Sequence, residues 1–307
     1  MNTVNLAVKH EGRIMLEAVK VDSEGREIGR RLLADWFDNL ITDIGLAAKV
    51  NEGWTSLQMV IGTGTSAPAF TDADMAQFKA QYYANSDAFI GNTSVSPYYG
   101  ATRCVSQFPA GQATGIITEV GLCMGTHGLS DFKLLTRALI KDTNGNPTSV
   151  EVLSDEQLNI TYDIRNYAPV ADVVTTANID GVDRTITIRP SKVGIIDSWR
   201  GNAGGGNLSV SNAYFGTVSL GTQFQEPGST DGGINTAQGL QSGVNAYVNN
   251  TLYRDFWLKM PAGGAYDIGG FLFNIYGLGA YQVKIDPPVH ITNTQSFKFT
   301  LRAAVSR

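Results

Sequence analysis

The chain has little charge and almost no cysteine. Only 17% of its 307 residues are Asp, Glu, Lys or Arg, below the roughly 25% of an average soluble domain. The 23 basic and 28 acidic residues give a net charge of −5, whereas counterion-driven binding to nucleic acid needs clustered positive charge. We therefore expect no nucleic-acid partner. Cys104 and Cys123 are too few for a disulfide framework or a cysteine-based zinc site, and we expect two buried thiols.

Long apolar segments are also missing. No apolar run approaches the ~20 residues that a membrane-spanning helix needs. Residues 1–5 lack the apolar core of a secretory signal peptide. The sequence therefore predicts a protein that is made in a cytoplasm and has no membrane partner.

Glycine, by contrast, is abundant, and its distribution indicates β structure. The chain has 34 glycines in 307 residues, more than the roughly 7% of average usage. They separate short runs typical of strands: buried runs at residues 115–123 and 134–141, and others, such as 158–165, in which apolar and polar residues alternate, as in a strand with one buried face. Such runs lie at residues 14–18, 27–33, 115–123, 134–141, 149–153, 158–165 and 297–302. The first two flank a turn at residues 22–25 and predict an N-terminal hairpin.

These runs predict a mainly β fold with two tandem, related antiparallel β-sandwich-like domains. The segment 168–171 contains Pro169 and is a candidate boundary. We therefore divide the chain into an N-terminal β-rich domain, residues 1–168, and a C-terminal β-rich domain, residues 169–307.

The first domain is also expected to contain one or two short amphipathic helices. Apolar side chains recur at helical spacing over residues 37–48, and Asp38 or Asn39 would cap that helix. A second helix would begin at residues 71–74, where two carboxylates suit a helix N-terminus.

A glycine motif at residues 62–67 satisfies the loose G-x-G-x-x-G/A fingerprint of dinucleotide sites. That function requires a helix that starts within the motif and points its amides at the pyrophosphate. Pro68 follows instead, and no acidic ribose partner ends the next strand. We interpret Gly62 and Gly64 as residues that let a core strand turn sharply into a surface loop.

The second half of the chain repeats part of the first. Residues 220–231 align without a gap on residues 61–72, so that Gly, Thr, Pro, Thr and Asp coincide. The run at 297–302 would then take the place of the strand that begins at residue 158. Gln223 stands where the first copy has Gly64, which again favours an architectural role for these glycines.

Five motifs occur in an order that resembles one known class of protein. They are Asp38-Asn39-Leu40-Ile41-Thr42, residues 61–72, Ile117-Thr118-Glu119-Val120-Gly121-Leu122, Thr136-Arg137-Ala138-Leu139-Ile140 and Ser154-Asp155-Glu156-Gln157-Leu158. Over residues 10–166 the chain resembles tail-associated structural proteins of tailed bacteriophages, which are described as tail fibre-like or baseplate-like. The resemblance implies a non-enzymatic component of the virion tail, neck or baseplate, made in the host cytoplasm. Its partners would be copies of itself and other phage virion proteins.

Catalytic and metal-binding patterns are weak. His10, His127 and His290 are far apart, and none has a ligand or catalytic partner at helical spacing. Residues 142–146 begin like a calcium-binding loop, but Pro147 occupies the position of its glycine. We therefore predict that the protein is not an enzyme and holds no cofactor or metal.

Aromatic residues are the best candidates for an interface. They gather in three clusters beside predicted loops, and aromatic side chains are enriched at interface hot spots. The candidate interface residues are Tyr82, Tyr98, Tyr99, Tyr253 and Trp257. Two alternatives stay open: these rings could pack on their own core, or they could bind sugars. In the second case the protein would be a receptor- or glycan-binding fibre-tip module with a bacterial surface receptor as partner, and depolymerase activity would remain open.

Overall fold

The computed structural model describes residues 3–191, 199, 207–208 and 211–307. It confirms a mainly β protein, with several sheets and one α-helix, α1 (Asp43–Asn51), in the described ranges. The long alternating runs of the sequence are strands. Burial alternates along much of the strand at residues 156–167, as the apolar pattern from residue 158 predicts.

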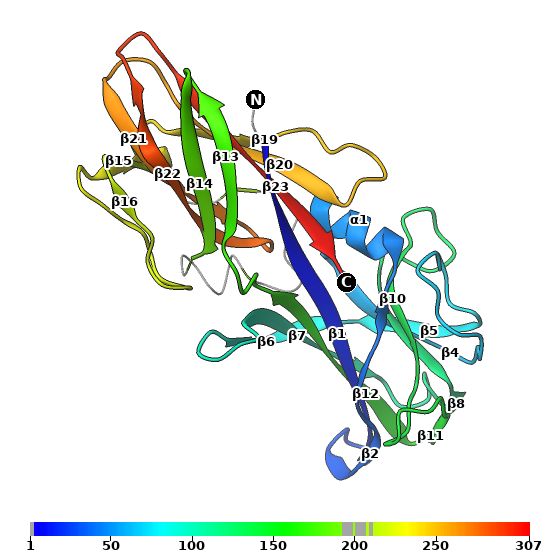
Figure 1. Ribbon diagram of the computed structural model, residues 1–307. Helices are drawn as coiled ribbons and strands as arrows, with labels where there is room; N and C mark the ends of the chain where they lie inside the picture. The colour runs from blue at the N-terminus through cyan, green and yellow to red at the C-terminus, as the bar shows by residue number, and fades with distance from the viewer. Residues whose placement is uncertain (1–2, 192–198, 200–206, 209–210) are drawn as a thin grey trace.

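An eight-stranded sheet extends through the whole molecule (Figure 1). Its order is β19-β20-β23-β1-β12-β7-β6, and β2 pairs with β1 beside this path. The strands are β1 (Thr3–Val21), β2 (Glu27–Asp38), β6 (Asn85–Asn92), β7 (Tyr99–Phe108), β12 (Glu156–Tyr167), β19 (Gln241–Val244), β20 (Tyr253–Met260) and β23 (Phe297–Ser306). β1 holds the sheet together, because residues 3–9 pair in parallel with β23 and residues 9–20 pair antiparallel with β12.

Two smaller sheets lie at opposite ends of the molecule (Figure 1). One has the order β3-β10-β9-β4-β5 and the other β13-β14-β22-β21-β15-β18. The first comprises β3 (Leu40–Ile41), β4 (Leu57–Gly62), β5 (Phe78–Tyr83), β9 (Glu119–Met124) and β10 (Lys133–Leu139). The second comprises β13 (Val173–Ile179), β14 (Val182–Pro190), β15 (Asn212–Phe215), β18 (Gly233–Asn235), β21 (Tyr266–Ile275) and β22 (Gly279–Ile291). Two two-stranded ribbons complete the fold: β8 (Gly115–Ile117) with β11 (Val150–Val152), and β16 (Val218–Ser219) with β17 (Gly228–Ser229).

Both smaller sheets cover the same face of the large sheet. The side chains buried along β1 stand at every second position over nearly its whole length: Val4, Leu6, Val8, Ile14, Leu16 and Ala18. Because side chains alternate across a strand, these residues share one face. The other face of the eight-stranded sheet, called the outer face below, is left to solvent.

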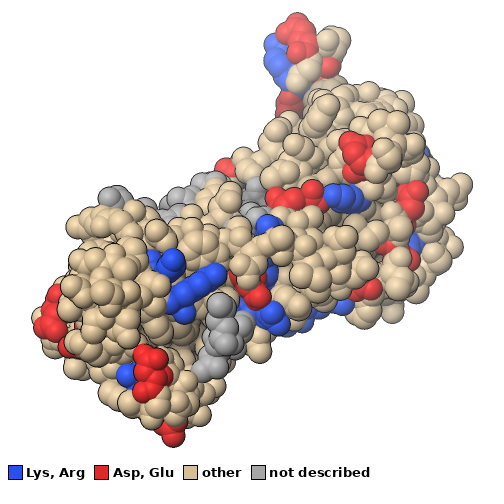
Figure 2. All heavy atoms as spheres, turned by 90° about the horizontal axis from the view of Figure 1, so that it is seen from above, with Lys and Arg blue, Asp and Glu red and all other residues tan. Residues whose placement is uncertain are grey.

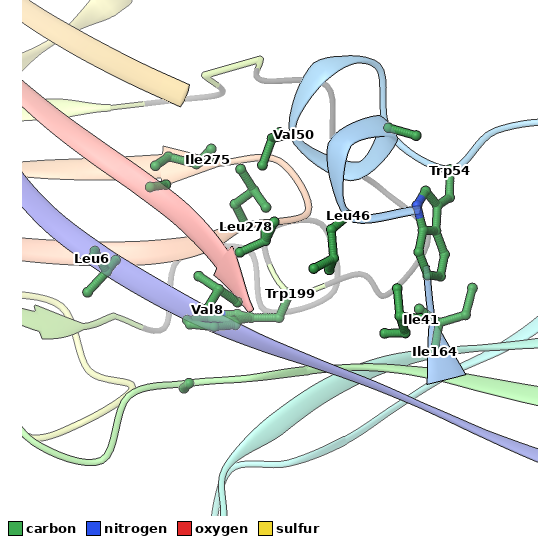
Figure 3. Close-up of a cluster of buried hydrophobic side chains, with 14 of the residues drawn as sticks. Leu6, Val8, Ile41, Leu46, Val50, Trp54, Ile164, Trp199, Ile275 and Leu278 are labelled. Atoms are coloured by element: carbon green, nitrogen blue, oxygen red, sulfur yellow. The ribbon is translucent and has the colours of Figure 1, made fainter. Parts of the chain in front are cut away.

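The hydrophobic core continues through the junction between the two ends (Figure 3). Leu6 of β1, Leu46 of α1 and Leu278 lie there around Trp199, whose side chain is 1% exposed. Arg254 of β20 donates a hydrogen bond to the carbonyl oxygen of residue 51 at the end of α1 (2.6 Å). A positive side chain at a helix C-terminus is favourable, so α1 is fastened to both ends of the molecule.

The predicted first helix starts too early. Residues 36–38 belong to β2, and Leu40 and Ile41 form β3, which pairs with β10. The cap is Thr42, whose hydroxyl accepts a hydrogen bond from the amide of Gly45 (2.9 Å), and not Asp38 or Asn39. The apolar spacing was real, but pairing with β10 satisfies the backbone of the first residues better than a helix would.

The expected second helix is wrong. No helix begins at residues 71–74, and the carboxylate of Asp72 instead binds Arg137. Of the apolar residues that follow, Met75 is buried before the next strand begins, and Phe78 and Tyr82 belong to β5, which pairs with β4. Two further predicted strands also differ in detail from the structure. The run at residues 115–123 breaks at Thr118 into β8 and β9. The run at residues 149–153 forms β11, which pairs with β8.

Candidate interaction surface

Two of the five candidate aromatic residues pack on the core. The ring centroid of Tyr82 lies 5.7 Å from that of Phe108, and the ring of Tyr98 meets Phe224 edge-on at 5.1 Å. Both tyrosines are partly buried against the main hydrophobic cluster. For these two residues the structure supports the alternative of rings folded onto their own core.

The other three candidates lie on strands of the outer face, each beneath a positive side chain. The guanidinium of Arg165 stands 4.6 Å from the ring centroid of Tyr99. That of Arg302 stands 3.8 Å from the ring of Tyr253. Such cation–π contacts contribute ~0.5–1 kcal/mol at exposed sites. The structure thus brings residues from both halves of the sequence onto one surface.

Trp257, the last candidate, is held on both sides. Its ring lies over Gly243 of the neighbouring strand, where an added Cβ would come closer than 3.0 Å to ring atoms. The ammonium group of Lys298 stands 4.6 Å from the ring centroid. An aromatic side chain that covers a glycine on an adjacent strand stabilises a sheet edge, so this ring has a structural role of its own.

Two buttressed ion pairs stand on the same surface. Arg103 of β7 binds Asp163 of β12 through two hydrogen bonds of 2.7 and 2.9 Å, and Asp163 is 2% exposed. Arg302 of β23 binds Asp255 of β20 with the same two distances. In both cases the hydrogen bonds to the carboxylate raise the pKa of the arginine. Bidentate pairs fix the geometry of planar groups, so both guanidinium groups are held in place on this surface.

Away from these pairs, charge gathers at the β1–β2 hairpin, where Arg26, Arg30 and Arg31 pair with acidic side chains. Figure 2 shows Lys, Arg, Asp and Glu in small groups among uncharged side chains on the face seen from above. The outer face therefore offers polar and aromatic contacts, a composition suited to another protein surface.

A buried network joins three of the five motifs. Glu119 at the start of β9 is 0% exposed and Arg137 of β10 is 2% exposed. Arg137 donates to Glu119 (2.7 Å), to Asp72 (2.7 Å) and to the carbonyl oxygen of Ser66 (2.9 Å). Glu119 in turn accepts from the amide of Gly64 (3.0 Å). From the sequence these residues were assigned to separate motifs, and no contact between them was predicted. The available signal was a Glu and an Arg, each within a largely apolar strand run, at residues 115–123 and 134–141.

The two glycines of the motif are required by close approach. Neither has a positive φ. A Cβ on Gly62 would come closer than 3.0 Å to the carbonyl oxygen of Gln77, and one on Gly64 closer than 3.0 Å to the Ala76 side chain. The Gly64 amide, which a dinucleotide site would use, is bound to Glu119. This geometry agrees with an architectural function for the motif.

The histidines and cysteines do not form a common site. Among residues 3–191, 199, 207–208 and 211–307, no three His, Cys, Asp or Glu side chains could hold a metal ion together. Burial and the charge of Lys49 lower the pKa of His10 to about 3. Burial raises the pKa of Cys104 and Cys123 to about 12, and both are free, buried thiols as expected.

No helix in the described part of the chain is long and apolar enough to cross a membrane.

Comparison with known proteins does not assign the chain to a family. No family model, curated protein or solved structure matches this chain. The functional interpretation therefore depends on the geometry above and on the resemblance of the motifs.

Proposed function

We propose that the chain is a non-enzymatic virion structural protein of a tailed phage. It would assemble as a homo-oligomer in the tail, neck or baseplate and join neighbouring subunits and other virion proteins. The observation that carries this proposal is the continuity of the body. β1 belongs to the sheet at both ends, and the core runs through the junction without a break. A continuous body of this kind would transmit force between partners, as a structural subunit must.

The proposal includes two related sandwich domains, at about residues 1–168 and 169–307. When the two-stranded ribbons β8–β11 and β16–β17 are set aside, seven strands occur in the same order with the same partners in each half. β4-β5-β6-β7-β9-β10-β12 pair as 4·5, 6·7, 7·12, 4·9 and 9·10. β15-β18-β19-β20-β21-β22-β23 pair as 15·18, 19·20, 20·23, 15·21 and 21·22. An identical order of pairing supports duplication of one unit.

The ion pairs of the outer face support the same duplication. Placing Phe299 over Ile160 is a shift of 299 − 160 = 139, and the same shift places Arg302 over Asp163. Both residues pair directly with their ionic partner on the neighbouring strand. The pair therefore recurs at the equivalent position with its charges exchanged.

Two details qualify this correspondence. Strand order equates β15 with β4, so the gapless alignment of Gly221 on Gly62 does not follow the strands. In addition, residues 3–9 of the first unit complete the large sheet beside β23 of the second. The two units are therefore proposed to act as one rigid body.

The receptor- or glycan-binding alternative has less support. Sugar binding by stacking needs a free aromatic face, and Arg302 and Lys298 stand over the rings of Tyr253 and Trp257. The bidentate bond of Arg302 to Asp255 holds that cation in place. A glycan array probed with the purified chain tests this alternative, with a Trp257→Ala variant as control. Binding that the substitution abolishes would favour it.

The test of the proposal is the particle itself. Virions are labelled with an antibody raised against the purified chain and viewed in negative stain, and the same antibody preabsorbed with the chain is the control. We expect label at a fixed position on the tail, neck or baseplate. In a reconstruction, each copy should bury more than ~1,000 Å² against its neighbours, the lower bound for a specific interface. Virions without the chain would refute the proposal, and a copy attached by one short segment would favour the receptor-binding alternative.

A further inference from the structure

β13 is the last strand of the six-stranded sheet, and no described strand lies along its outer edge. It pairs with β14 in unbroken register, from Val173 opposite Ile188 to Ile179 opposite Val182. The two residues of the connecting turn, Asp180 and Gly181, have φ values of 53° and 78°. This is the two-residue hairpin turn in which the flanking residues form a hydrogen-bonded pair.

That turn fixes which backbone groups face outward. Residues 173, 175, 177 and 179 exchange hydrogen bonds with β14, because hydrogen-bonded pairs alternate along an antiparallel ladder. The N–H and C=O groups of Val174, Thr176 and Asn178 therefore point away from the sheet. Among residues 3–191, 199, 207–208 and 211–307, no strand pairs with this edge. The side chains of the same three residues are exposed, that of Val174 to 60%.

β13 also lacks the devices that protect an edge strand. Charged side chains, proline and bulges discourage pairing with another chain, and residues 173–179 (VVTTANI) contain none of these. Most of these residues favour extended structure. A regular, uncharged and β-prone edge is a site where another strand adds.

The other edge strands of the three large sheets are protected or short, as far as the structure describes them. β2 carries Glu27, Arg30 and Arg31. β6 carries Asp87 at a break in its register with β7, and β5 carries Lys79. β18 and β19 have only three and four residues. The contrast singles out β13 as the edge left open for a partner.

We propose that two copies of this chain pair through β13, antiparallel, about a twofold axis at Thr176. The choice of a second copy rests on the proposed homo-oligomeric function, and the register rests on the strand itself. Thr176 would lie opposite Thr176 of the partner subunit, and Val174 opposite Asn178 of the partner subunit. Each of these is a hydrogen-bonded pair with two bonds, so every outward backbone group of Val174, Thr176 and Asn178 finds a partner.

The side chains fit this register on both faces. On the inner face, Val173 meets Ile179 of the partner subunit, and Thr175 meets Ala177 of the partner subunit. Cross-strand pairs of this kind stabilise a sheet, and Thr–Thr pairs are among the favourable ones. Within residues 173–179 no like charges are placed opposite each other; one position beyond either end, Asp172 faces Asp180 of the partner subunit, and Arg189 binds the Asp172 carboxylate through two hydrogen bonds. The pairing joins two six-stranded sheets into one continuous sheet, and a twofold contact of this isologous type is the commonest in homo-oligomers.

Cysteine crosslinking tests the register. In the twofold pair the two Cα atoms at position 176 are ~5.5 Å apart, within the ~4.4–6.8 Å of disulfides. Thr176→Cys should give a disulfide-linked dimer under mild oxidation. The matched control is Thr185→Cys, an equally exposed threonine opposite Thr176 on β14. Its two copies would be ~14 Å apart, three strand spacings, and should not crosslink. The native cysteines are buried.

Two further single variants make the register specific. Val174→Cys and Asn178→Cys should each fail to crosslink alone, because each faces the other position in the partner. Mixed together, the two proteins should form the disulfide dimer. Crosslinking of each variant with itself but not with the other would overturn the proposed register.

A charge placed on the edge tests the interface without oxidation. Thr176→Lys would set two ammonium groups opposite each other, whereas Thr185→Lys adds the same charge one strand away. In analytical ultracentrifugation we expect the first to raise the dimer dissociation constant by ~10-fold or more, as ~1.4 kcal/mol or more would, and the second to leave it unchanged. Far-UV circular dichroism of both variants establishes that they fold.

The outcomes separate this inference from the proposed function. An oligomer that persists in Thr176→Lys and gives no disulfide with Thr176→Cys would overturn pairing through β13 and leave the virion role standing. A chain that is monomeric at every soluble concentration and gives no disulfide overturns the pairing as well. Only absence of the chain from virions refutes the function.

Discussion

Removing Arg137 should destabilise the first half of the molecule strongly. Arg137 and Glu119 are 2% and 0% exposed, and the guanidinium is the only positive group among the Glu119 hydrogen-bond partners that the structure describes. Arg137→Met keeps the bulk of the side chain but leaves the Glu119 carboxylate buried without its countercharge. Breaking a buried ion pair in this way costs about 3–5 kcal/mol.

The assay is urea unfolding at pH 7, followed by far-UV circular dichroism and by tryptophan fluorescence. Of the four tryptophans, Trp54 is buried in the affected half, where its indole N–H donates to the carbonyl oxygen of Gly45 (2.8 Å), so its unfolding contributes to the fluorescence change. The matched control is Lys20→Met, which removes one partner of an exposed pair with Asp155. Exposed pairs contribute little because water and salt screen them, so the control should leave the unfolding midpoint unchanged within error.

A double-mutant cycle decides whether the two charges act together. In the double variant Arg137→Met with Glu119→Gln, the buried charge is gone and the glutamine carbonyl still accepts from the Gly64 amide. We expect its loss of stability to be smaller than the sum of the two single losses by at least ~1 kcal/mol. Equal effects of Arg137→Met and Lys20→Met, or strictly additive losses in the cycle, would refute the reasoning.

Three further predictions follow from the same structure. Gly64→Ala should lower the free energy of unfolding by ~1–3 kcal/mol because the added Cβ overpacks the site, and NAD or ATP should not change this effect. Gly228→Ala should leave stability unchanged, because an added Cβ there meets nothing within 4 Å and φ is not positive. Binding of either nucleotide at micromolar concentration would contradict this prediction. His10 has a pKa of about 3 when folded against 6.5 when unfolded. The unfolded state therefore binds the extra proton, and stability falls by ~1.4 kcal/mol per pH unit as the pH drops from 6.5 toward 3; acid unfolding of His10→Gln should lack this component. Cys104 and Cys123 have pKa values of about 12, so a thiol reagent at pH 8 should label neither in the folded protein and both in urea, and rapid labelling of the native chain would show that they are not buried.

Local signals in the sequence were sufficient wherever the structure is locally determined. The turn at residues 22–25 follows from Asp22, which accepts hydrogen bonds from the amides of residues 24 and 26, and from Gly25, which has a φ of 78°. The strand from residue 156 to 167 follows from its alternating pattern. The turn depends on neighbours within a few residues, and the strand shows itself in a local alternating pattern, although its partners β1 and β7 are far away in the sequence.

The helix predictions failed where a distant strand competed. Leu40 and Ile41 stand at helical spacing with later apolar residues, yet they pair with Thr136 and Arg137 almost a hundred positions away. Spacing alone cannot weigh a local helix against a hydrogen-bond ladder to a remote segment. The same limit applies to residues 71–74, where the carboxylate of Asp72 binds Arg137 and does not lie at a helix N-terminus.

By itself, then, the sequence determined a mainly β protein with small turns, buried thiols and glycines of architectural function. Only the tertiary structure decided which strands pair, that β1 joins both halves, and which aromatic rings face solvent. Tyr82 and Tyr99 look alike in the sequence, but one ring packs on Phe108 and the other lies under Arg165 on the outer face. Strand partners are chosen by contacts between residues far apart in the chain. A single residue's surroundings therefore exist only after the sheets have formed.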